Sequence, residues 1–180
     1  MTEVLHGDGF RLRRATTEDV DFFVALAGHE DVEPFLAVVR ARDPALVRQE
    51  IERSLAEPKE SGRFVIEVDE DGQWRRAGVV GYDVANSRSR IANLGGLAVH
   101  PAFRGRKLAD ETARLFQRHL LLELDFHRLQ LEIYGFNQRA IEHAERSGFI
   151  REGAKRKAYW RHDEWVDGVL FGLVREDLEE

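Results

Sequence analysis

The 180-residue chain contains no cysteine at all. A protein thiol therefore cannot relay a covalently bound group, and zinc sites with thiolate ligands are excluded. Long apolar runs are missing as well: stretches such as 120–122 and 169–174 are far shorter than a membrane span, which requires about 20 residues. The opening segment, MTEVLHGDGF, has neither the basic flank nor the apolar core of a signal peptide. We therefore expect a cytoplasmic protein with no membrane partner.

Linkers, internal repeats and low-complexity segments are also missing, so we expect a single domain over residues 1–180 with its core at about 10–177. Hydrophobic residues make up 43% and charged residues 33% of the chain, which is typical of a folded globular protein. The net charge of −6 argues against nucleic acid as the main partner. A basic cluster at 104–107 therefore stands out against the acidic average.

The hydrophobic periodicity predicts both strands and helices. Strands are predicted at 10–16, 64–68, 76–84, 91–99 and 128–134, and in a final hairpin over 156–174. Helices are predicted after the capping residues Thr16 and Asp43, over about 104–123, and from Asn137 to Gly148. This order predicts an α/β protein (α+β), with a mixed sheet and helices on both faces. Two adjacent glycines at 95–96 predict a β-bulge inside the strand 91–99.

The segment 104-RGRKLA-109 combines basic residues with the predicted start of a helix. The first turn of a helix leaves backbone N–H groups unpaired and carries a partial positive charge, which together favour phosphate binding. A solvated basic turn would have the same composition. The preceding bulged strand and the following helix favour the phosphate site, because such a site requires a strand–loop–helix context.

The pattern V-H-P-x-x-R-G-x-x-L-A at 99–109 resembles the GNAT superfamily of acetyl-CoA-dependent N-acetyltransferases. The loop of that family reads Gln/Arg-x-x-Gly-x-Gly/Ala; Arg104 matches its first position and Ala109 its last, whereas Lys107 stands where glycine is usual. The resemblance implies the acyl-CoA N-acyltransferase fold with bulged central strands. It also implies that the coenzyme pyrophosphate binds the loop residues Arg104, Gly105, Arg106, Lys107, Leu108 and Ala109. The pantetheine arm would pair with Leu97, Ala98 and Val99, and the Val99 N–H would stabilise the thioester oxyanion.

A second motif, 137-NQRAIEHAERSGF-149, is similar to the Asn-x-x-Ala-…-Gly-Phe signature of the same superfamily. Asn137 and Gly148 also suit the two ends of a short helix, and we expect both interpretations to hold. The resemblance implies that Asn137 and Ala140 lie beside the coenzyme. It extends from about Phe10 to Asp177 and is most specific over 91–150.

Glu132 lies on the predicted strand 128–134, on the face opposite its apolar neighbours. Such a carboxylate is either exposed at the surface or tuned for a function. The chain resembles most closely the ribosomal-protein N-terminal (alanine/serine) acetyltransferase-like branch, in which a glutamate five residues before the motif asparagine acts as general base. The tyrosine acid that relatives carry seven residues after the asparagine is replaced by Ala144. The thiolate would then take its proton from solvent.

The C-terminal segment also resembles that branch, and its aromatic residues could either cover the core or line an acceptor cleft. The candidate acceptor contacts are Tyr134, Tyr159 and Trp160. The histidines show no metal-ligand spacing, so no metal is expected.

We therefore expect an enzyme that transfers an acetyl group from acetyl-CoA to a primary amine, by direct attack in a ternary complex. The acceptor would be a small molecule or a peptide, and a homodimer is possible. Two alternatives stay open: a coenzyme A-binding sensor with weak or no turnover, and a general nucleotide or phosphate binder.

Overall fold

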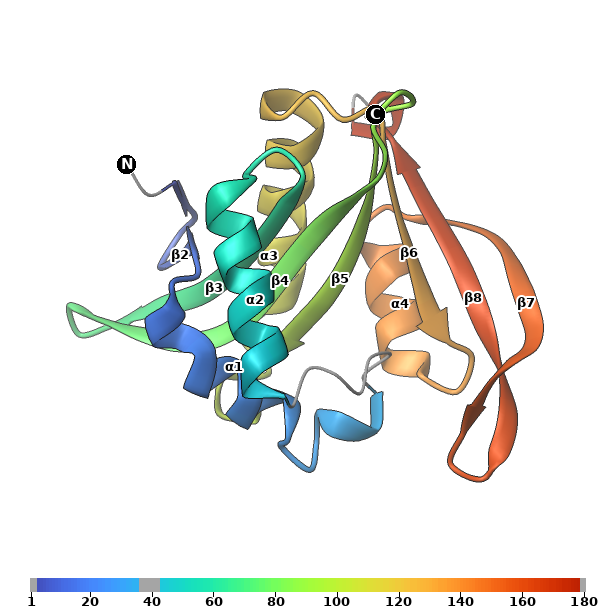
Figure 1. The fold of residues 1–180 in the computed structure, drawn as a ribbon, viewed down its shortest axis with the longest axis horizontal. Coiled ribbons are helices and arrows are strands. Elements are labelled where there is room, and N and C mark those ends of the chain that lie inside the picture. Colours follow the sequence, from blue (N-terminus) through green and yellow to red (C-terminus); the bar gives the residue numbers. More distant parts are fainter. Residues whose placement is uncertain (1–2, 36–42, 179–180) are drawn as a thin grey trace.

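A computed structural model describes residues 3–35 and 43–178, and Figure 1 shows their arrangement. The described strands form one eight-stranded sheet in the order β1-β2-β3-β4-β5-β6-β8-β7. Only β5 and β6 run parallel, and the other neighbours are antiparallel. The bounds are β1 (Val4–His6), β2 (Phe10–Arg14), β3 (Ser61–Glu70), β4 (Gln73–Asn86), β5 (Ile91–Val99), β6 (Arg128–Tyr134), β7 (Ile150–Arg161) and β8 (Glu164–Val174). The predicted mixed sheet is confirmed.

Helices cover both faces of this sheet, as predicted. The helices α1 (Val20–Ala27) and α2 (Pro44–Ala56) share a small core cluster with Val65 of β3. The helices α3 (Leu108–Arg118) and α4 (Gln138–Arg146) contribute to the main core together with Phe64 and Ile66. Because successive strand residues point to opposite faces, the alternation along β3 assigns the two helix pairs to opposite sides. Figure 1 shows α2 in front of the sheet and α3 behind it.

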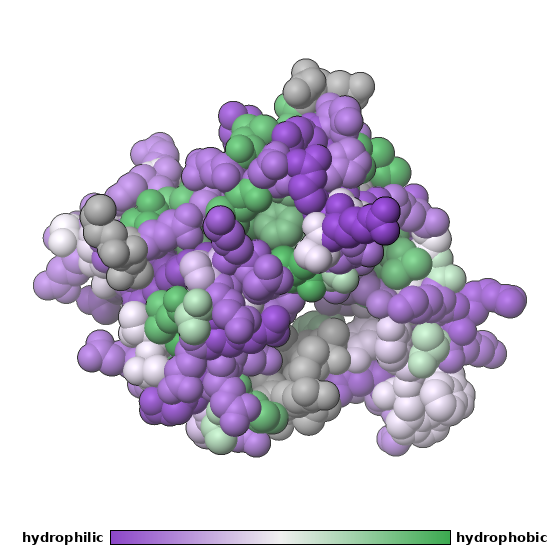
Figure 2. Space-filling model, turned by 45° about the horizontal axis from the view of Figure 1, so that its top comes forward, coloured by the Kyte–Doolittle hydropathy of each residue, from purple (hydrophilic) through white to green (hydrophobic). Residues whose placement is uncertain are grey.

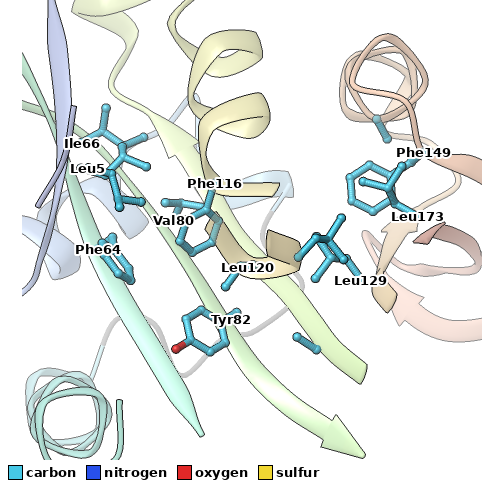
Figure 3. Close-up of a cluster of buried hydrophobic side chains, with 14 of the residues drawn as sticks. Leu5, Phe64, Ile66, Val80, Tyr82, Phe116, Leu120, Leu129, Phe149 and Leu173 are labelled. Carbon is cyan, nitrogen blue, oxygen red and sulfur yellow. The ribbon is translucent and has the colours of Figure 1, made fainter. Parts of the chain in front are cut away.

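The main core lies between α3 and the centre of the sheet (Figure 3). Phe116 packs edge-on against Phe64, with ring centroids 5.3 Å apart, and against Tyr82 at 6.0 Å. The Tyr82 hydroxyl donates to the Pro58 carbonyl and accepts from Arg14 at 3.2 Å, so the buried phenol is fully hydrogen-bonded. In the view of Figure 2 the outer surface is mostly hydrophilic, and hydrophobic residues gather only in separate patches.

Helix ends follow the capping residues that the sequence predicts. The Thr16 N–H donates to Asp19 at 2.9 Å, the Ala45 N–H to Asp43 at 2.9 Å, and the Ala140 N–H to Asn137 at 3.2 Å. Each carboxylate or amide oxygen satisfies a backbone donor that a helix start leaves unpaired.

The main differences from the prediction concern the helix after β5, the last hairpin and the first strand. The helix expected from residue 104 begins at Leu108, because Gly105 (φ 81°) and Lys107 (φ 57°) have left-handed backbone angles that an α-helix excludes. Its last part, His119–Glu123, is a π-helical turn. The last hairpin begins at Ile150 instead of 156, because two bulges in β7 break the alternation that marks a strand. The strand β1 was not predicted, since three residues show no recognisable period.

The predicted bulge in β5 is confirmed. Ala98 pairs with Val79 and Gly95 with Gly81, so the register of β5 shifts against β4 at Gly96. On its other side β5 pairs with β6 only from Ile91↔Arg128 to Asn93↔Gln130. Beyond that point the two strands diverge, as Figure 1 shows. We call this gap in the backbone hydrogen-bond ladder between β5 and β6, in the middle of the sheet, the slot.

The close approach of β4 to the bulged strand predicts a specific stability defect. A Cβ on Gly78 would lie 2.4 Å from the Ala98 carbonyl oxygen, a backbone atom that cannot retreat without opening the ladder. We expect Gly78→Ala to lower the free energy of unfolding by about 1–3 kcal/mol, measured by urea denaturation. Gly95→Ala is the control, because nothing lies within 4 Å of its added Cβ. Equal stability of the two variants would contradict the close approach.

Candidate active site

One edge of the slot is the backbone of β5. The His100 N–H donates to Ala77 of β4 at 2.7 Å. Hydrogen-bonded and non-hydrogen-bonded residues alternate along an antiparallel ladder, so the neighbouring Val99 N–H points away from β4, toward β6. Leu97, Ala98 and Val99 are partly exposed there. This edge has the geometry of an unpaired strand that an extended ligand can join.

The loop between β5 and α3 lies at one end of this edge. Arg104 donates to the Asp31 carbonyl at 3.1 Å, and Arg106 donates to Glu70 at 3.2 Å. Burial, together with the nearby positive charge of Arg139, lowers the pKa of the Arg104 guanidinium. The loop therefore carries basic side chains, with Arg106 paired to Glu70, just before the unpaired N–H groups of the first turn of α3.

Lys107 is the N-cap of α3 and has φ 57° and ψ 14°. This left-handed conformation is the one that glycine adopts without steric cost. Lys107 therefore holds a backbone conformation that glycine would also adopt, and its exposed side chain adds a cation beside the loop.

The first turn of α3 is fastened to α4 by an ion-pair cluster. His143 Nδ1 lies 2.7 Å from Asp110 Oδ1, and Arg146 lies 3.4 Å from the same oxygen. Burial alone would raise the pKa of Asp110, but the hydrogen bonds from His143 and Arg146 outweigh it and lower that pKa. The Asn137 side chain caps α4, and Ala140 lies in its first turn.

Glu132 projects from β6 on the face opposite Leu129 and is 29% exposed at its side chain. Both of its carboxylate oxygens have partners: Tyr159 Oη donates to Oε1 at 2.6 Å, and Lys155 Nζ donates to Oε2 at 3.2 Å. The hydrogen bond to Glu132 is the main cause that raises the pKa of Tyr159, and likewise of Lys155. Gly168 of β8 provides the space, because a Cβ there would lie 2.0 Å from Oε1.

A bulge in β7 brings the two partners of Glu132 together. Lys155 pairs with Gly168 and Tyr159 with Val166, so a four-residue step on β7 faces a two-residue step on β8. A regular strand would separate Lys155 from Tyr159 by about 13 Å, whereas the two-residue step of β8 spans about 7 Å. Lys157, with φ 51°, closes the bulge by donating its N–H to Asp167 at 2.8 Å.

Aromatic side chains surround this carboxylate. Tyr134 stacks on Phe136 with centroids 5.5 Å apart and meets Tyr159 edge-on at 5.7 Å. Phe136 also contacts His162 at 5.2 Å. Of the predicted acceptor contacts, Tyr134 and Tyr159 therefore lie beside Glu132. Trp160 does not join them: it is 58% exposed and packs against Trp165.

Sequence reasoning missed Lys155, Phe136 and Gly168 as parts of this site. Regular alternation would have placed Lys155 on the face of Tyr159, but only the bulge brings both side chains to one carboxylate. No sequence pattern marked Gly168 as part of the site, because its role depends on the Glu132 side chain of another strand.

Within residues 3–35 and 43–178, no group of three or more metal-ligating side chains is close enough to hold a metal ion. No helix in the same part of the chain has the length and hydrophobicity to cross a membrane.

Three features occur together here: the slot beside a bulged strand, the basic loop before α3, and the carboxylate on the next strand. Together they define one class of protein. The profile of the family described as "Acetyltransferase (GNAT) domain" matches residues 10–150. The chain therefore belongs to the GNAT acetyltransferases, and the predicted family and enzyme class are confirmed.

Individual relatives agree with this assignment. The chain is 35% identical over 83 residues to the SPbeta prophage-derived uncharacterized N-acetyltransferase YokL of Bacillus subtilis, a match that spans 46% of this chain and 47% of YokL. Among solved structures, spermidine N-acetyltransferase from Vibrio cholerae in complex with CoA and spermine has a TM-score of 0.85 at 17% identity, covering 97% of this chain and 100% of that one. Ribosomal-protein-S5-alanine acetyltransferase from Vibrio fischeri has a TM-score of 0.80 at 14% identity, covering 97% and 98%. At these identities the structures establish the fold, and both an N-terminal and a polyamine acetyltransferase share it.

The left-handed conformation of Lys107 predicts that glycine would fit this position better. A non-glycine residue there costs about 1–2 kcal/mol, and the added freedom of glycine in the unfolded chain offsets about 0.5–1 kcal/mol of that. We expect Lys107→Gly to raise the free energy of unfolding by about 0.5–1 kcal/mol in urea denaturation. Lys59→Gly is the control, because φ at Lys59 is not positive. A loss of stability in both variants would contradict the expectation.

Proposed function

We propose that this protein transfers the acetyl group of acetyl-CoA to a primary amine by direct attack in a ternary complex, within a single N-acetyltransferase domain. The observation that carries the proposal is the carboxylate of Glu132, which lies across β8 but comes from β6, the strand next to the unpaired part of β5. The relatives support an amine acceptor, since one is a spermidine N-acetyltransferase with bound spermine and another an alanine acetyltransferase of a ribosomal protein.

The coenzyme would lie along β5 and the loop that follows it. Backbone N–H groups between Arg104 and Ala109 would bind the diphosphate, with the side chains of Arg104, Arg106 and Lys107 adding positive charge. The pantetheine arm would pair with Leu97–Val99 as an additional strand, and Asn137 and Ala140 of α4 would flank it. The relative from Vibrio cholerae, whose structure contains CoA, supports this choice of coenzyme.

The chemical step needs a neutral amine, whereas an alkylamine is protonated at neutral pH. In the proposed mechanism Glu132 accepts a proton from the acceptor ammonium, directly or through a water molecule. The amine nitrogen then attacks the thioester carbonyl, and the Val99 N–H stabilises the oxyanion. The nitrogen of the intermediate releases its surplus proton to solvent as the C–S bond breaks. The thiolate takes its own proton from solvent, because the residue at 144 is an alanine buried in the core (3% exposed).

Replacing the carboxylate tests its role as the base. We expect Glu132→Gln to lower kcat/KM by about 100-fold or more, measured by thiol release from acetyl-CoA with the best acceptor of an amine panel. Glu164→Gln is the matched control, because that exposed glutamate lies on the β7–β8 hairpin away from the slot. Activity of Glu132→Gln equal to that of the control at every pH would remove Glu132 from the mechanism.

The loop and slot predict selectivity for coenzyme A over other phosphate compounds. A pyrophosphate site alone would bind ATP equally well, whereas the free edge of β5 adds backbone pairing that only the pantetheine arm can use. We expect calorimetric titration to give a markedly lower Kd for coenzyme A than for ATP, and ATP to compete poorly. Equal affinities would support a general nucleotide binder. Tight coenzyme A binding without acetyl consumption across the amine panel would support a sensor, as the missing tyrosine at 144 suggests.

The same amine panel would identify the acceptor. A measurement of mass in solution would test the predicted homodimer. An acidic chain with a carboxylate and aromatic rings at the site suits a cationic acceptor.

A further inference from the structure

The ammonium of Lys155 lies where an acceptor ammonium is expected. Its Nζ is 3.2 Å from Glu132 Oε2, so the carboxylate that would take a proton from the acceptor already binds a primary alkylammonium of this same chain. We propose that Lys155 occupies the acceptor's ammonium position on Glu132, and that an acceptor binds by replacing it. This inference rests on the proposed function, and it adds a residue that selects the acceptor.

The contact between Lys155 and Glu132 depends on several features of β7 and β8. Gly168 leaves room for the carboxylate to lie across β8, where any side chain would collide with Oε1. The β7 bulge, closed by the hydrogen bond from the Lys157 N–H to Asp167, brings Lys155 next to Tyr159. Three features on two strands therefore present one lysine and one phenol to opposite oxygens of the same carboxylate.

The two partners of Glu132 differ in how firmly they are held. The Lys155 side chain is 52% exposed, and an exposed ion pair of a flexible lysine contributes little stability. Tyr159 packs edge-on against Tyr134, and its hydroxyl is only 2.6 Å from the carboxylate. An incoming ammonium would therefore displace the lysine and leave the tyrosine to hold the carboxylate in position.

Competition of this kind affects acceptors according to their charge. A cationic amine replaces one ammonium by another, so the carboxylate stays paired throughout. A neutral acceptor offers no such exchange and leaves Lys155 in place. Lys155 would thus weaken the binding of alkylammonium acceptors by the free energy of its own contact, and would leave the binding of neutral ones unchanged.

Butylammonium is the matched probe, because it reproduces the end of a lysine side chain; 1-butanol is its neutral counterpart. Kd values are measured by NMR titration of the protein without acetyl-CoA, so that binding is separated from turnover. We expect Lys155→Met to bind butylammonium about two- to fivefold more tightly than the natural chain, in proportion to a weak ion pair. In a Glu132→Gln background, Lys155→Met should leave the Kd of butylammonium unchanged. In the natural chain, Arg156→Met removes the adjacent positive charge and should also leave that Kd unchanged.

Each remaining outcome decides between the two proposals. An equal gain in Lys155→Met and Arg156→Met, or a gain that persists without the Glu132 carboxylate, would reduce Lys155 to a general charge effect and overturn the inference. Weaker butylammonium binding in Lys155→Met would also overturn it, since Lys155 would then help to bind the acceptor. The proposed function is judged separately by the loss of turnover in Glu132→Gln. Tighter butylammonium binding by Lys155→Met, together with no acetyl transfer by any variant, would therefore overturn the proposed function alone.

Discussion

The candidate site depends on the failure of β5 and β6 to remain paired. Parallel pairing is limited to three residue pairs, and the bulge at Gly96 then turns β5 away. Without that divergence, the backbone groups of Val99 would be engaged in a ladder and no slot would exist. Gly78 permits the bulged course from the other side, because any larger residue there would push β4 and β5 apart.

A second constraint is the charge balance around Glu132. A half-buried carboxylate is stable only when hydrogen bonds or opposite charges compensate it. Here one oxygen is paired with a phenol and the other with an ammonium. Because Lys155 occupies one of the two oxygens, an acceptor ammonium would reach that oxygen of the carboxylate only after the lysine has left.

Much of the fold follows from local patterns. The alternation of β6, the caps at Thr16, Asp43 and Asn137, and the paired glycines of β5 were all recognised correctly, because each is a short-range signal. The features that were missed depend on partners distant in sequence.

Lys155 lies just before residue 156, where the last hairpin was predicted to begin, and only the register with β8 places it beside Tyr159. The predicted start of α3 was wrong for a related reason: a lysine in the sequence does not indicate a left-handed backbone conformation, whereas a glycine does. The resemblance to the GNAT superfamily led to the proposed coenzyme loop and the proposed role of Glu132, but the motifs do not encode the arrangement of β7 around that glutamate.

The limited pairing of β5 with β6 also bears on the mechanics of the molecule. Strands β1–β5 and β6–β8 are two half-sheets, joined along their backbones by one short ladder and otherwise by the helices and side chains that pack across them (Figure 1). An extended molecule bound in the slot would connect the two half-sheets. The free protein would then be more flexible than the protein with an occupied slot, because the bound molecule would make the whole sheet more rigid.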